Sequence, residues 1–259
     1  MLEQTEVTLE DLKHLVSERA LEGDTVLLNM GPQHPSTHGV LRLLLELDGE
    51  TIVSCIPDIG FLHTGIEKNM ESKRYEQAAT MTDRLDYLNT VGNVLAYCLA
   101  IEKLTGLDVP PRAQAVRVIL CELHRIASHL VWLATQALDL AAQSVFLYCF
   151  REREYVLDIL ELVSGQRMMT TYFRPGGLWR DVPDEFEDTV RQFIEYFPAR
   201  IDQYDTLLTK NPLFLERTQK IGVISGEEAV HWGLSGPTLR GSGVAYDLRT
   251  LSLIHISEP

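Results

Sequence analysis

The sequence predicts an α+β fold, mainly α, in which a small N-terminal antiparallel sheet packs on a helical bundle. Short apolar runs separated by turn residues fill residues 25–56, and from Gly65 onward the hydrophobic spacing is helical almost throughout. At 259 residues, 45% of them hydrophobic, the chain can bury a substantial core. It has no internal repeat and no low-complexity linker, so we expect a single domain over residues 25–249.

The N-terminal part is expected to hold a short helix and then the sheet. Residues 1–24 form a segment whose amphipathic helix begins at Thr8 as N-cap. The apolar runs at 25–30, 40–47 and 51–56 are typical of strands, and Asp48-Gly49-Glu50 turns the second run into the third.

The loop between the first two runs, Gly31-Pro-Gln-His-Pro-Ser-Thr-His-Gly39, carries two histidines four residues apart. Its place at the mouth of a small sheet is a usual one for chemistry on a rigid scaffold. The alternative is a tight surface turn in which the histidines are incidental.

Four long helices are expected beyond the sheet, with breaks at Thr105-Gly106, Pro110-Pro111, Ser164-Gly165 and Asp181-Val-Pro183. They cover residues 84–104, 113–140, 144–163 and 184–208.

The second of these helices has two distinct faces. At about 100° per residue, its polar residues fall in one stripe opposite a wholly apolar side. The stripe contains no lysine, which favours a polar cavity or a subunit interface, while an ordinary solvated face is the alternative. Its members are Glu122, Arg125, Ser128, His129, Trp132, Thr135, Gln136 and Asp139.

Charge and hydropathy exclude several classes of function. The formal net charge is −14 with no Lys or Arg cluster, so no nucleic-acid partner is expected. From its acidic first residues, we expect neither a signal sequence nor an Arg-rich leader. The most apolar stretch, 131–150, carries Gln136 and Asp139, so we expect no membrane span and membrane contact only through partners.

The chain is expected to bind no metal and no redox cofactor of its own. Its four cysteines are far apart and form no CxxC pair, which predicts small buried hydrophobes. It also has no P-loop and no GxGxxG motif.

Several ordered blocks together resemble a known family, the 49 kDa or D-type subunits of NADH:quinone oxidoreductase, which form the quinone site of respiratory complex I. The likeness runs from about Thr25 to Arg249, and the family is related to the large subunit of nickel–iron hydrogenases. The resemblance implies a small β module on a helical bundle. The blocks are residues 31–39, 60–68, 82–87, 110–112, 122–130, 150–154 and 241–249.

The hydrogenase relatives have a CxxC pair near the place where this chain reads Thr80-Met-Thr-Asp83. Nickel needs those thiolates, and none is present. The resemblance therefore favours the quinone-reducing branch of the family.

The resemblance implies a set of quinone-site residues. It places His38 and Tyr87 at the quinone head group, where each can donate a hydrogen bond and then a proton. Asp139 matches the carboxylate partner of that histidine, and Thr135 matches a position that lines the cavity.

The resemblance also implies an electron donor outside the chain. His129 and Arg84 match positions beside the terminal iron–sulfur cluster of a neighbouring subunit, where a cation raises the cluster's potential. The implied enzyme is proton-translocating NADH:quinone oxidoreductase. This chain is one subunit of it, inactive alone, and its partners are the terminal-cluster subunit and the membrane arm. The expected location is the cytoplasmic side of the bacterial inner membrane, as a peripheral protein.

Two alternatives stay open. The same subunit type serves complexes that take electrons from ferredoxin or another donor, and a non-catalytic structural subunit could retain the fold. The tail at 250–259 departs from the family and matches a translated sequencing adapter. We therefore expect an artefact there, at the end of a truncated gene fragment.

Overall fold

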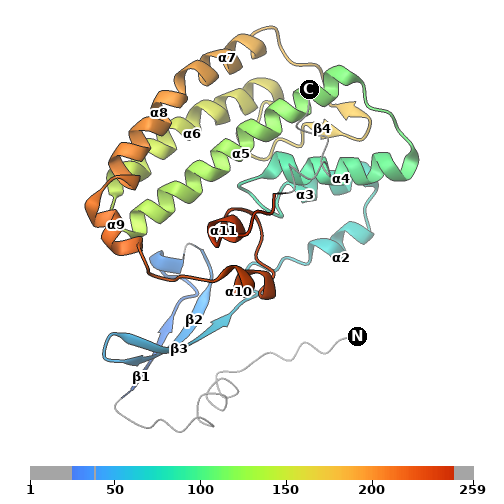
Figure 1. Cartoon of the computed structure of the whole chain (residues 1–259). Helices are drawn as coiled ribbons and strands as arrows, with labels where there is room; N and C mark the ends of the chain where they lie inside the picture. The colour runs from blue at the N-terminus through green and yellow to red at the C-terminus, as the bar shows by residue number, and fades with distance from the viewer. Residues whose placement is uncertain (1–24, 38, 248–259) are drawn as a thin grey trace. The chain divides into compact units, whose positions relative to one another are not determined.

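The computed structural model describes residues 25–37 and 39–247 (Figure 1). The chain divides between Ile66 and Glu67 into two compact units, a sheet unit and a helical unit. Both elements of the predicted α+β, mainly α class are present, while the packing of one on the other stays a prediction. The predicted helix after Thr8 and the tail at 250–259 lie outside the described residues.

The sheet unit is a three-stranded antiparallel meander in the order β1-β2-β3. Its strands are β1 (Val26–Met30), β2 (Arg42–Asp48) and β3 (Thr51–Asp58). Asp48 pairs with Thr51 across a two-residue turn, and Gly49 within it has φ +61°. The predicted strands and the turn at Asp48-Gly49-Glu50 are therefore confirmed.

The loop from β1 to β2 depends on a glycine at its first position. Gly31 has φ +92°, a region that side chains with a Cβ rarely adopt. A Cβ at this position would also lie 2.1 Å from the Leu41 carbonyl oxygen. The short 3₁₀ helix η1 (Pro35–Thr37) follows it.

The helical unit is built around two long neighbouring helices, α5 (Pro111–Asp139) and α6 (Gln143–Ser164) (Figure 1). Shorter elements surround them. In chain order these are α2 (Ile66–Glu71), α3 (Tyr75–Thr82), α4 (Thr90–Thr105), the β4–β5 hairpin (Phe173–Arg174 and Gly177–Leu178), α7 (Phe186–Tyr196), α8 (Pro198–Tyr204), the π-helical turn η2 (Asp205–Thr209), α9 (Pro212–Thr218), α10 (Gly226–His231) and α11 (Gly236–Gly241).

Two predicted helices differ from the structure for local reasons. The first begins at Thr90, because residues 83–89 turn instead of continuing from α3. The Asp86 carboxylate accepts the Leu88 amide within that turn, a usual alternative to a helical bond. The fourth is divided into α7, α8 and η2, with Pro198 at the first position of α8.

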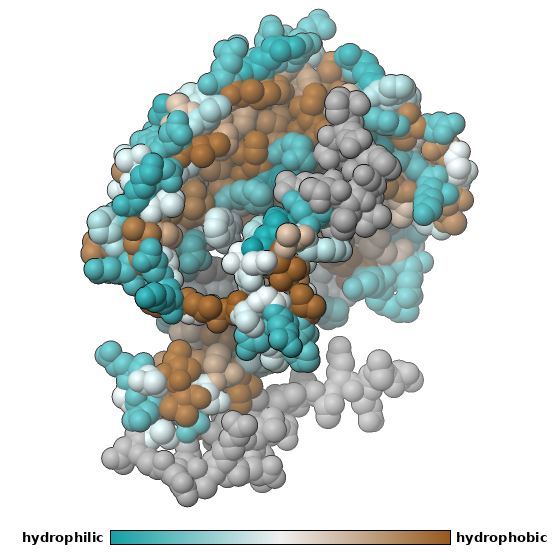
Figure 2. Space-filling model, in the orientation of Figure 1, coloured by the Kyte–Doolittle hydropathy of each residue, from teal (hydrophilic) through white to brown (hydrophobic). Residues whose placement is uncertain are grey.

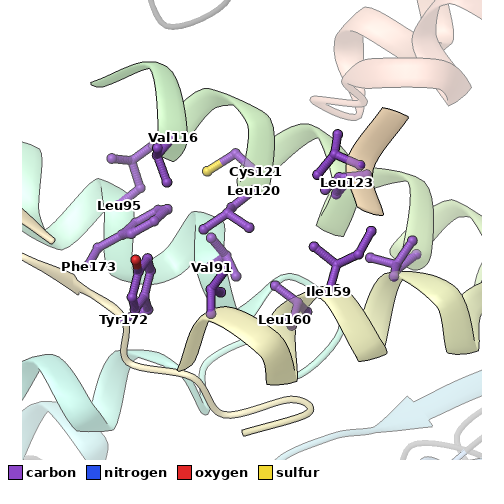
Figure 3. Close-up of a cluster of buried hydrophobic side chains, with 14 of the residues drawn as sticks. Val91, Leu95, Val116, Leu120, Cys121, Leu123, Ile159, Leu160, Tyr172 and Phe173 are labelled. Carbon is purple, nitrogen blue, oxygen red and sulfur yellow. The ribbon is translucent and has the colours of Figure 1, made fainter. Parts of the chain in front are cut away.

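The main core lies where α4, α5, α6 and the hairpin segment meet (Figure 3). Val91 of α4 lies beside Leu120 of α5 and Leu95 beside Val116, while Tyr172 and Phe173 close one side. These side chains are almost wholly buried and hold α5 at the centre of the unit.

By length and composition, α5 could cross a membrane, so the prediction that no segment qualifies is wrong on that measure. Core helices of other proteins pass the same test. Since the apolar side of α5 packs into the core, its hydropathy has a structural cause within this fold.

A buried ion pair joins α4, α5 and the hairpin. Arg117 and Glu102, each less than a tenth exposed, form two hydrogen bonds of 2.7 and 3.1 Å. Arg117 also donates to the carbonyls of Arg174 and Gly177, and Glu102 accepts the Gly176 amide. A desolvated pair needs such additional partners, because burial of two charges is otherwise costly.

The cysteines follow the prediction at three positions of four. Cys98, Cys121 and Cys149 are buried, and burial raises the pKa of each thiol, to about 11, 12 and 11 respectively. Cys55 is exposed on β3, contrary to the prediction, because it faces away from the covered side of the strand.

Candidate functional site

The polar stripe predicted on the second long helix is a real face of α5. All eight of its residues are exposed or half-buried, whereas Leu123, Ala127, Leu130, Ala134 and Ala137 opposite them are buried. Trp132 in the stripe is 62% exposed. An exposed tryptophan on a lysine-free face is typical of a surface that meets another molecule.

Three predicted site residues occupy this face at steps of four to six residues. His129 and Asp139 are exposed, and Asp139 is the last residue of α5. Thr135 is half-buried, and its hydroxyl donates to the carbonyls of Val131 and Trp132 at 3.0 and 3.1 Å. The hydroxyl hydrogen of Thr135 is therefore used within the helix, so this side chain can form part of a wall but does not donate outward.

Two further predicted residues lie between α3 and α4. We call this segment, together with the first residue of α4, the Tyr87 loop (Asp83–Thr90). Tyr87 stands in its middle and is 51% exposed. Arg84 is exposed as well, and its guanidinium donates to the Thr80 carbonyl of α3. The phenol and the guanidinium are thus both open to a partner or a ligand.

Two hydrogen bonds hold the first residue of the Tyr87 loop, Asp83, in place. Asp83 is wholly buried, and its Oδ2 accepts both the amide and the hydroxyl of Thr171, at 2.9 and 2.5 Å. Burial raises the pKa of Asp83, against the opposing effect of the Thr171 hydrogen bonds and of Arg84 and Arg174.

The other end of the loop is fastened to two different elements. The Thr90 hydroxyl donates to the Met168 carbonyl at 2.7 Å, and the Nδ1 of His124 on α5 accepts the Val91 amide at 3.4 Å. His124 is wholly buried, and burial, with the nearby Arg153, lowers its pKa to about 4. The imidazole is therefore neutral at physiological pH.

Between its ends, the loop is held by its own neighbours. The Asp86 carbonyl accepts the Asn89 amide at 3.1 Å and the Asn93 side-chain amide at 3.0 Å. Both hydrogen bonds hold Asp86, directly before Tyr87, and the first also holds Asn89, two residues after it.

The predicted His38 lies outside the described residues, within a loop that belongs to the sheet unit. His34 of the same loop is used locally. Its carbonyl accepts the Thr37 amide and hydroxyl at 3.0 and 2.8 Å, and its Nδ1 accepts the Ser36 amide at 3.2 Å. This bonding supports a structural role for His34.

The helical unit also has a groove of about 730 Å³ between α5 and α7, where apolar side chains gather in Figure 2. Its floor includes Ile119, Leu123, Val190 and Ile194. Among the stripe residues only Glu122 lines it, and of the described quinone-site residues Tyr87, Thr135 and Asp139 do not. The groove is therefore a different surface from the one that carries these three residues.

The structure adds residues that sequence reasoning missed. Asp83, Thr90 and Thr171 fix the Tyr87 loop. Of these, the sequence points only to Asp83, which belongs to the segment where hydrogenases have a CxxC pair. Thr171 gave no sequence signal, because its partner is 88 positions away.

Comparison with known proteins gives consistent matches. Residues 139–253 match the family model described as respiratory-chain NADH dehydrogenase, 49 kDa subunit. A D-type subunit of NADH-quinone oxidoreductase from Roseiflexus castenholzii is 64% identical over 236 residues, 90% of this chain and 57% of the relative. The D-type subunit from Chloroflexus aurantiacus is 61% identical over 236 residues, with the same two shares.

A third relative extends the match along the chain. A D-type subunit of NADH-quinone oxidoreductase from Solibacter usitatus is 55% identical over 249 residues, 96% of this chain and 61% of the relative. The chain thus spans somewhat more than half the length of the curated relatives that it matches. The predicted resemblance is confirmed.

Proposed function

We propose, from the premise that this chain is homologous to the 49 kDa subunit family of the respiratory-chain NADH dehydrogenase, that it is the quinone-site subunit of a respiratory complex I. The observation that carries the proposal is the identity of 55–64% to relatives named as D-type subunits of NADH-quinone oxidoreductase. Those names favour NADH over ferredoxin as the electron source of the complex.

In the proposed reaction, a quinone takes two electrons and two protons and becomes a quinol. A quinone carbonyl only accepts hydrogen bonds, and it becomes more basic with each added electron. A neutral donor such as the Tyr87 phenol therefore binds the reduced head group more tightly than the oxidised one. The exposure of Tyr87 on a fastened loop supports this role.

His38 is proposed as the second donor to the head group, with Asp139 as its carboxylate partner. A carboxylate beside an imidazole orients the ring and favours its protonated form. Asp139 is exposed and is the last residue of α5. Thr135, one turn earlier, forms part of the cavity wall.

Arg84 and His129 are proposed to lie beside the terminal iron–sulfur cluster, which a neighbouring subunit holds. Their side chains are exposed, as contact with another subunit requires. A cation there favours the reduced cluster and raises its potential. The electrons come from NADH in another subunit and pass through this cluster to the quinone.

The proposed setting is a peripheral position on the cytoplasmic side of the bacterial inner membrane, with membrane contact through partner subunits. The partners are the terminal-cluster subunit and the membrane arm. Quinone reduction would change the charge around Asp139 and so drive proton translocation in that arm. The chain is not expected to be active alone.

The test is Tyr87→Phe in the assembled complex, with Tyr155→Phe as its matched control. Tyr155 is similarly exposed, at 47%, but lies on α6, where its ring packs against Tyr196. We expect Tyr87→Phe to lower NADH:quinone turnover by about 100-fold, the loss of one preorganised donor. NADH oxidation by ferricyanide should be unchanged in both variants. Full quinone turnover in Tyr87→Phe would refute the assignment.

A further inference from the structure

The Tyr87 loop is tied at both ends to one distant segment, Met168–Thr171, which we call the brace. Asp83 at the start of the loop accepts two hydrogen bonds from Thr171. Thr90, at its end, donates to the carbonyl of Met168. Because the two fastening points lie on one short segment, the distance between the loop's ends depends on the brace.

The Asp83 carboxylate joins the loop to the brace at a considerable cost in desolvation free energy. The residue is wholly buried, and Oδ1 has no hydrogen-bond partner among the described residues. Burying a carboxyl with one oxygen unpaired is unfavourable, so an apolar contact would join the loop to the brace at a smaller cost in free energy. A carboxylate does, however, fix the orientation of Thr171 relative to the loop, since it accepts two hydrogen bonds from that one residue.

The brace itself is held in a strained and well-anchored form. Thr171 has φ +37°, which a β-branched residue adopts only under constraint. Arg174 donates to the Thr171 carbonyl, while its own carbonyl accepts from Arg117 at 2.7 Å. The brace is thus continuous with the buried Arg117–Glu102 pair.

Tyr87 lies midway between the two hydrogen-bonded ends of its loop, Asp83 and Thr90. It is four residues from Asp83 and three from Thr90, and its own side chain is half exposed. A phenol that reaches a reacting oxygen must be placed to within about half an ångström. The placement of this one rests on the backbone of its loop, which Asp86 holds beside Tyr87 and which the brace holds at both ends.

We propose that Asp83 is a positioning residue for Tyr87, and that the brace Met168–Thr171 sets the reach of the phenol toward the quinone head group. This inference deepens the proposed function and rests on it. Asp83 is buried and touches no ligand itself, so its effect passes through the loop.

The first experiment compares variants at both ends of the tie in membranes of a bacterium that assembles the complex with this subunit. Asp83→Asn replaces one acceptor oxygen by an NH₂ group, and Thr171→Val removes the hydroxyl donor at constant shape. Both should lower kcat for NADH:quinone turnover by about 10-fold with KM within about twofold, because a displaced donor is lost mainly in the transition state. Thr171→Ser, which keeps the donor, should restore most of the turnover.

The matched control is Asp108→Asn, which makes the same charge change at an exposed residue between α4 and α5. It should leave turnover at the wild-type level. NADH:ferricyanide activity of the membranes reports assembly in every variant. If Asp83→Asn fails to assemble, the contrast between Thr171→Val and Thr171→Ser decides.

The second experiment separates positioning from general stability. In a Tyr87→Phe background, Thr171→Val should lower turnover no further, since the group that it positions is already missing. An equal 10-fold loss in both backgrounds would overturn the inference, as would full turnover in Thr171→Val. If Tyr87→Phe alone retains full turnover, the proposed function fails instead, so the two failures are distinguishable.

Discussion

The two loops that carry the predicted head-group donors differ in how their ends are held. The β1–β2 loop is held by hydrogen bonds between residues two or three positions apart and by the conformation of Gly31. The Tyr87 loop also has hydrogen bonds between near neighbours, but its two ends are held by partners 78 and 88 positions away. The first loop depends on its own residues, and the second depends in addition on contacts with Met168 and Thr171.

The difference between the loops indicates which substitutions should displace each donor. Changes near His38 should act locally, within the sheet unit. Changes that disturb Tyr87 can instead lie anywhere along the chain of contacts from Asp83 through the brace to Arg117. Three variants of the chain test this contrast on stability.

The largest effect is expected from Glu102→Gln, which leaves Arg117 buried without its countercharge. We expect a loss of about 3–5 kcal/mol in the free energy of unfolding, because the partner charge stays desolvated. Urea unfolding followed by circular dichroism measures it. The double variant Glu102→Gln/Arg117→Met should recover part of the loss, and an unaltered midpoint in the single variant would show that the pair is not buried as described.

A smaller effect, confined to the sheet unit, is expected from Gly31→Ala. The new Cβ would meet the Leu41 carbonyl oxygen in a left-handed backbone conformation, for a loss of about 3 kcal/mol. Gly49→Asn is the matched control, because Gly49 also has positive φ but open space around it, and Asn tolerates that conformation. Hydrogen exchange of the β1–β2 amides should rise in the first variant only. Faster exchange in the helical unit would contradict the local character of this loop.

The smallest effect comes from the titration of His124 at the end of the Tyr87 loop. The folded pKa of about 4 lies below the unfolded value of about 6.5, so the unfolded chain binds the additional proton between these values. Stability should therefore fall as the pH is lowered through this window, by about 2 kcal/mol at pH 5.

The His124 contribution is isolated by comparing the stability of the protein with that of its His124→Asn variant at each pH, because Asp83 titrates in both. The raised pKa of Asp83 works in the opposite direction, since its folded carboxyl keeps a proton at a pH where the unfolded one has lost it. The difference between the two proteins in melting temperature should grow smaller from pH 7 to pH 5. A constant difference over that range would show that His124 titrates normally.

Sequence reasoning succeeded where a pattern is local. The turn at Asp48-Gly49, the strand runs and the polar face of α5 follow from dihedral preference and from helical or alternating spacing. It failed at the start of α4, where a side chain within the turn competes with the helix. It also missed the division of the last predicted helix at Pro198.

The sequence by itself therefore determined the α+β class, the main helices and the likeness to the complex I subunit. It also determined the face of α5 that carries Thr135 and Asp139. Each of these features depends on patterns among residues that are close together in the chain. Only the tertiary structure decided that Asp83 is buried on Thr171, that His124 is neutral in the core, and that one segment holds both ends of the Tyr87 loop. Those features arise from desolvation and from hydrogen bonds between distant residues, which exist only once the helices have packed.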